Sequence, residues 1–64
     1  MKDYQERIIK EKTELDIRIA NLENFIATSD TWNTLSTPEQ KRLMRQQVLM
    51  ELYQEVLWER IRHF

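Results

Sequence analysis

The sequence contains no cysteine and no glycine, and it has one proline (Pro38) and one histidine (His63). Without cysteine there is no disulfide and no thiolate metal site, and one histidine cannot hold a metal alone. Without glycine, the phosphate-binding loops and tight hairpin turns that depend on it are excluded. The lack of strand and hairpin signals favours an all-α fold.

Charge of one sign and long apolar runs are also missing. The chain has 10 basic and 11 acidic residues, for a net charge of −1. This balance makes nucleic acid an unfavourable partner. No apolar run approaches the roughly 20 residues of a membrane span, and the N-terminus lacks the apolar core of a signal peptide. We therefore expect a cytoplasmic protein, in the host cell cytoplasm if it is phage-encoded.

Groups that could carry catalysis are scarce. A nucleophile–base pair would need a cysteine or serine near a histidine, and the single His63 lies at the end of the chain. No set of residues has the spacing of metal ligands. The sequence thus predicts no enzymatic activity, no metal and no cofactor.

Apolar residues recur with helical spacing in two segments, which predicts a single helical hairpin over residues 1–64. We expect a helix over about 3–28, a connection over about 29–37 and a helix over about 38–63. Thr37 is the expected N-cap of the second helix, followed by Pro38 in its first turn. In the first helix the apolar face consists of Ile8, Leu15, Ile19, Leu22 and Ile26.

The second helix is apolar on more than one side. At roughly 100° per residue, one group forms a seam for the first helix; it comprises Leu43, Met50, Tyr53, Leu57, Ile61 and Phe64. A second row lies on another side, and Trp58 projects away from both. We predict an oligomer interface formed by Val48, Leu49, Leu52, Val56 and Trp58. Because 64 residues bury little surface alone, the expected fold class is all-α, an antiparallel two-helix hairpin assembling into a homo-oligomeric helical bundle.

One polar cluster is a candidate site, at the end of the hairpin away from the connection. It comprises Tyr4, Arg7, Glu11, Lys12 and Arg60. In one interpretation it binds a small anionic ligand, because arginine presents a planar fork of donors and tyrosine a stacking face. In the other it is a structural salt-bridge cluster in which Glu11 pairs with Arg60 or Arg7.

Three sequence patterns carry a family resemblance: Y-x-x-R-I-I-x-E-K-x-E-L, N-L-E-N-F-I and R-Q-Q-V-x-M-x-x-Y-x-x-V-L-x-x-R-I. With them the chain resembles a family of short phage and prophage proteins named after a gene product of a crAss-like bacteriophage. The most specific matching residues are Arg7, Glu11, Gln46, Tyr53 and Arg60. The resemblance implies a phage origin and a helical hairpin.

Two functions are compatible with this resemblance, by analogy with other small phage proteins. The first is a non-enzymatic binding protein that antagonises host defence by sequestering an anionic nucleotide-type immune signal between protomers of an oligomer. There, Tyr4, Arg7 and Arg60 would contact the ligand, while Glu11 and Lys12 would orient the arginines. The alternative is a protein–protein module, either a stoichiometric inhibitor of a host defence protein or a small structural adaptor.

Overall fold

The computed structural model describes residues 2–64, which form three helices. They are α1 (Asp3–Thr28), α2 (Asp30–Thr34) and α3 (Thr37–Arg62). The all-helical fold class is confirmed, with no strand in the described residues. None of these three helices combines the length and hydropathy that crossing a membrane requires.

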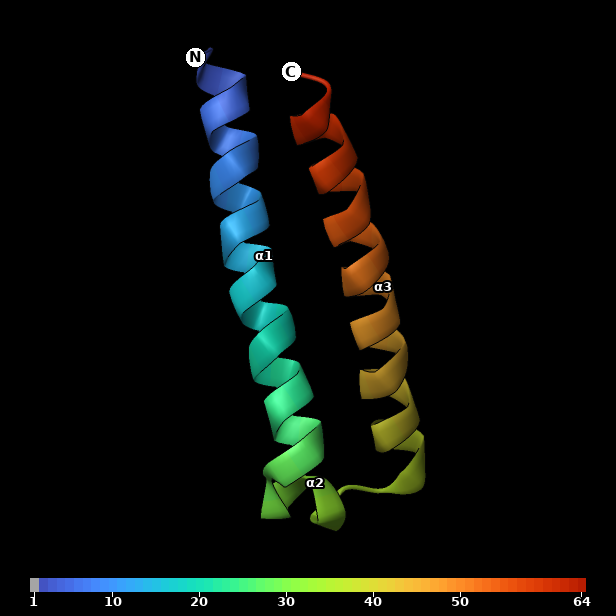
Figure 1. Cartoon of the computed structure of the whole chain (residues 1–64). Helices are drawn as coiled ribbons and strands as arrows, with labels where there is room; N and C mark the ends of the chain where they lie inside the picture. Colours follow the sequence, from blue (N-terminus) through green and yellow to red (C-terminus); the bar gives the residue numbers. More distant parts are fainter. Residues whose placement is uncertain (1) are drawn as a thin grey trace.

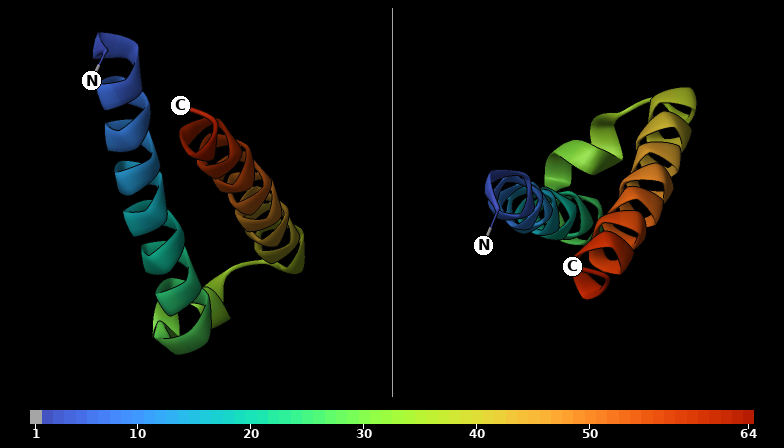
Figure 2. Two further views of the ribbon diagram at one scale, coloured as in Figure 1. Left: turned by 45° about the horizontal axis from the view of Figure 1, so that its top comes forward. Right: turned by 90° about the horizontal axis from the view of Figure 1, so that it is seen from above.

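The two long helices lie side by side and run in opposite directions, so that both ends of the chain are at one end of the molecule (Figure 1). Figure 2 shows α1 along one side of α3, with α2 beside their joined ends. The molecule is elongated, with principal extents of 46 × 16 × 14 Å. This arrangement exposes most side chains of both helices to solvent.

The connection contains a short helix that the sequence pattern did not predict. Ser29 begins α2 by accepting a hydrogen bond at Oγ from the backbone N–H of Thr31, at 3.2 Å. The Trp32 ring packs edge-on against Phe25 of α1, with 6.2 Å between ring centroids. The serine and threonine side chains of this segment therefore hydrogen-bond to nearby backbone groups, while Trp32 covers the end of α1.

The start of α3 differs from the expected cap by one residue. Ser36, rather than Thr37, is the N-cap, and its Oγ accepts from the Glu39 backbone N–H at 3.3 Å. Pro38 lies in the first turn, as its fixed φ favours. The Gln40 side chain donates to the Trp32 carbonyl at 2.9 Å and so joins α3 to α2.

The core between α1 and α3 is small. Ile8, Leu15 and Ile19 of α1 and Leu57 of α3 are buried, and Leu57 is completely inaccessible. Met50 and Ile61 pack against this group. A core of this size leaves the single chain with limited hydrophobic stabilisation.

The seam of α3 is rotated relative to the expectation. Tyr53 was expected within it but is exposed, by 45 %. Gln47 and Gln54 are half-buried instead. These residues share one helical stripe with Leu43, Met50 and Leu57 at roughly 100° per residue. Gln54 can lie at the seam because its side-chain amide donates a hydrogen bond to Asp16 of α1.

Candidate functional site

Tyr53 and Glu11 form a hydrogen bond between the two long helices. The Tyr53 hydroxyl donates to Oε1 of Glu11. The bond to the Glu11 carboxylate raises the pKa of Tyr53, since losing the proton would place two negative charges together. The positive charge of Arg60 acts in the opposite direction and favours a lower pKa of Tyr53.

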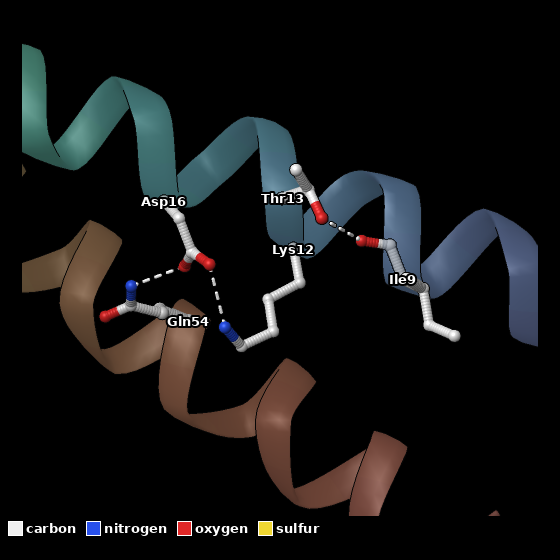
Figure 3. A network of polar contacts seen from close by, with 5 residues as sticks. All are labelled: Ile9, Lys12, Thr13, Asp16 and Gln54. Atoms are coloured by element: carbon white, nitrogen blue, oxygen red, sulfur yellow. Dashed lines mark hydrogen bonds and ion pairs between the residues drawn. The ribbon is translucent and has the colours of Figure 1, made fainter.

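A second polar contact between α1 and α3 lies at Asp16. Its carboxylate accepts from Lys12 Nζ at 2.8 Å and from Gln54 Nε2 at 2.5 Å (Figure 3). The Gln54 bond, followed by the Lys12 bond, lowers the pKa of Asp16 because both favour the charged carboxylate. Lys12 thus occupies an interruption of the apolar seam with its charge balanced by Asp16.

Two cations lie against the Trp58 ring. Lys12 Nζ is 5.5 Å from the ring centroid and the Arg62 guanidinium carbon is 5.8 Å from it. Lys12 and Trp58 also line an open surface depression together with Gln54 and Glu55. The cations are attracted by the negative face of the indole ring and keep it oriented beside the Asp16 contact.

The end of the molecule that carries both termini holds the remaining members of the predicted cluster. The Tyr4 ring packs edge-on against Phe64, with 6.0 Å between centroids and 81° between planes. Arg7 lies on α1 one turn before Glu11 and lines an open depression with Asp3, Glu6 and Lys10.

The five residues of the predicted ligand site are divided between two sides of the seam. Glu11 and Lys12 are consecutive, so their side chains leave α1 roughly 100° apart. Glu11 meets Tyr53, near Arg60, whereas Lys12 meets Asp16 and Trp58. The structure therefore brings Glu11 and Arg60 to one side and places Lys12 on the other.

The ion pairs in the structure differ from those expected for a structural salt-bridge cluster around Glu11. Within residues 2–64 the ion pairs are Lys12–Asp16, at 2.8 Å, and Glu39–Arg42, at 2.7 Å. Glu11 bonds to a tyrosine, and neither Arg7 nor Arg60 pairs with a carboxylate in this part of the chain. The polar group that joins the helices on the Lys12 side is Asp16, which the sequence pattern did not single out.

The residues of the predicted oligomer interface are all exposed. The fractions are 54 % for Val48, 59 % for Leu49, 53 % for Leu52, 49 % for Val56 and 48 % for Trp58. Trp58 lies on the Lys12 side of the seam and is separated from the other four around α3.

The similarity to known proteins extends over nearly the whole chain. A family model described as Sequestin matches residues 2–63. The chain belongs to the Sequestin family. No curated protein and no solved structure matches the chain. The expectation of a family of small proteins is thereby confirmed, while the phage origin stays a prediction.

The name Sequestin points to a binding or sequestering role. Within the described residues, no group of three or more histidine, cysteine, aspartate or glutamate side chains could hold a metal ion. Sequence reasoning missed the roles of Asp16, Gln54 and Tyr53. The available signal was that Asp16 follows the seam-interrupting Lys12 by one helical turn, where the two charges attract.

Proposed function

We propose that this chain is a phage-encoded, non-enzymatic binding protein that assembles into a homo-oligomer and antagonises host defence. Its ligand is a small anionic molecule of nucleotide type, held between protomers and so withdrawn from the host receptor. The family name supports a sequestering role.

The observation that carries the proposal is a pair of exposed arginines, Arg7 and Arg60, that make no ion pair within residues 2–64. Arg60 favours a lower pKa of Tyr53 through its charge, and Arg7 lies one turn from Glu11 on the facing helix. Exposed guanidinium groups offer paired donors to a phosphate, and the exposed ring of Tyr53 or Tyr4 offers a stacking face for a base.

Assembly is supported by the balance between core and exposed apolar surface. Four side chains are buried between α1 and α3, whereas the apolar row Val48, Leu49, Leu52 and Val56 is about half exposed. An apolar row of this extent on a chain with so small a core is typical of an interface. Residues of two protomers would then enclose a ligand that one open face cannot surround.

Isothermal titration calorimetry with a panel of cyclic and linear nucleotides tests the proposal. We expect at least one to bind, and R60Q to weaken its binding by about tenfold or more through loss of one charged donor pair. The matched control is K41Q, which removes the same charge from an exposed position near the start of α3. Absence of heat with every nucleotide, or equal weakening by R60Q and K41Q, would contradict the proposal.

The second candidate is a protein–protein module that inhibits a host defence protein or acts as an adaptor. It is favoured by the same exposed row on α3, since an amphipathic helix of another protein could pack there. Substitution of Val48, Leu52 and Val56 by serine separates the two functions. Loss of host-protein capture by a chain that binds no nucleotide would favour the module, and unchanged capture would rule out this row as the docking face.

A further inference from the structure

The exposed face of α3 is self-complementary about Leu52. Taking roughly 100° per residue, Arg45, Val48, Leu52, Val56 and Glu59 fall within an arc of about 80°. Arg45 and Glu59 lie on opposite sides of Leu52 in the sequence, each seven positions away. Val48 and Val56 each lie four positions from it. A rotation that exchanges the two directions of the helix therefore exchanges an arginine with a glutamate and a valine with a valine.

This face points away from α1. On the same geometry, Leu52 projects about 180° from the middle of the α3 seam, where Leu57, Met50 and Gln54 pack against α1. Figure 2 shows α1 along one side of α3 only. A second helix can approach the Leu52 side without contacting the first one.

The charges at the two ends of this face have no partner in the described chain. The ion pairs within residues 2–64 involve neither Arg45 nor Glu59, and both residues are exposed. The three apolar side chains between them are about half exposed. An apolar centre bounded by one positive and one negative end matches an inverted copy of itself.

We infer that α3 packs antiparallel against α3 of a second copy of this chain, with a two-fold axis at Leu52. Leu52 then meets its own copy, Val48 meets Val56 of the second chain, and Arg45 pairs with Glu59 at both ends. A two-fold interface of this kind uses the same patch on both chains. The assembly has four long helices, with the two α3 helices central. This inference specifies the assembly on which the proposed function rests.

Charge reversal tests the arrangement because the two-fold axis makes each substitution act twice. R45E and E59R, each alone, turn two attractions into two repulsions and should raise the dimer dissociation constant at least about tenfold. An equimolar mixture of R45E with E59R restores opposite charges at both ends and should re-form a mixed dimer. The double variant R45E/E59R should dimerise like the wild type. Sedimentation equilibrium measures the constants, and circular dichroism checks that each variant is helical.

Cysteine cross-linking gives a second measurement that needs no change of charge, because the natural chain has no cysteine. A mixture of V48C with V56C should give a heterodimeric disulfide, and L52C a disulfide with itself. I17C, at an exposed position of α1, is the matched control and should cross-link less. Cross-linking of I17C as fast as L52C would overturn the inference.

The outcomes separate this interface from the proposed function. A wild-type oligomer that is insensitive to R45E and E59R would overturn the two-fold arrangement and leave assembly and sequestration standing. A dimer that behaves as described but binds no nucleotide would support the interface and contradict sequestration. A wild-type monomer at all concentrations would contradict the interface and the assembly together.

Discussion

The side chains of Asp16 in α1 and Gln54 in α3 meet across the seam, with 2.5 Å between Oδ1 and Nε2. This contact joins positions 38 residues apart in the sequence. Lys12 bonds to the other oxygen of the same carboxylate, at 2.8 Å. The bond from Gln54 to this charged acceptor fixes the rotation of α3 about its axis, since a turn of one position would bring Tyr53 to this place instead.

A double-mutant cycle should detect coupling between these two residues. We expect Asp16→Ala and Gln54→Ala to be non-additive by about 1 kcal/mol in the free energy of unfolding, because the acceptor is charged and partly shielded. The matched control is Gln47 with Glu51, a hydrogen bond of 3.3 Å within α3, where about 0.5 kcal/mol or less is expected. Urea unfolding at one fixed protein concentration measures both cycles. Additive effects at Asp16 and Gln54 would show that the contact does not stabilise the fold.

The stability that Asp16 contributes should disappear in acid. Its pKa in the folded chain lies below the ordinary value of 3.8, so the contribution is complete above that pH and is lost as pH falls through the lower folded pKa. The expected size is at most about 1 kcal/mol, because the side chain is 39 % exposed and water screens it.

Comparing wild type with D16N from neutral pH into acid measures this contribution. The difference in unfolding free energy should be constant down to about pH 4 and then shrink toward zero. A difference that stays unchanged below that pH would contradict a depressed pKa for Asp16. The comparison cancels most changes that acid causes at the other carboxyl groups, which both proteins share.

Periodicity was enough to predict the helical class but not the rotation of α3. An apolar pattern counts Tyr53 toward the seam and treats Gln54 as surface, because hydrophobicity is the only quantity that it measures. In the structure Gln54 is half-buried and Tyr53 is exposed. Gln54 is favoured over Tyr53 at the seam because it bonds to the Asp16 carboxylate of α1. An apolar pattern within α3 alone cannot contain that information.

The same reason explains why the candidate site was only partly foreseen. Glu11 was grouped with Arg60 by its place along the hairpin, and in the structure it bonds to Tyr53, whose pKa Arg60 also affects. Lys12 was grouped with them although its side chain lies roughly 100° around α1 from that of Glu11. Position along a helix pair is easier to read from a sequence than position around it.

Tyr53 should ionise at a higher pH than an ordinary tyrosine. Its hydrogen bond to Glu11 raises its pKa above 10.0, and E11Q should return the midpoint toward that value by removing the negative charge. Absorbance titration of tyrosine ionisation measures the midpoint, with Y53F providing the baseline. Circular dichroism over the same range verifies that the helices persist. Identical Tyr53 midpoints in wild type and E11Q would show that the Glu11 contact is not maintained in solution.

Stability should depend on Ser36 more than on Thr37, although both have side chains suited to an N-cap. Ser36 has extended backbone angles of φ −64° and ψ 154°, and its Oγ accepts from the Glu39 N–H. S36A should therefore cost about 1 kcal/mol. T37A should change stability by about 0.5 kcal/mol or less, since Thr37 is an exposed residue of the first turn. Thermal unfolding followed by circular dichroism compares the two variants. A larger loss in T37A than in S36A would place the start of α3 one residue later than in the structure.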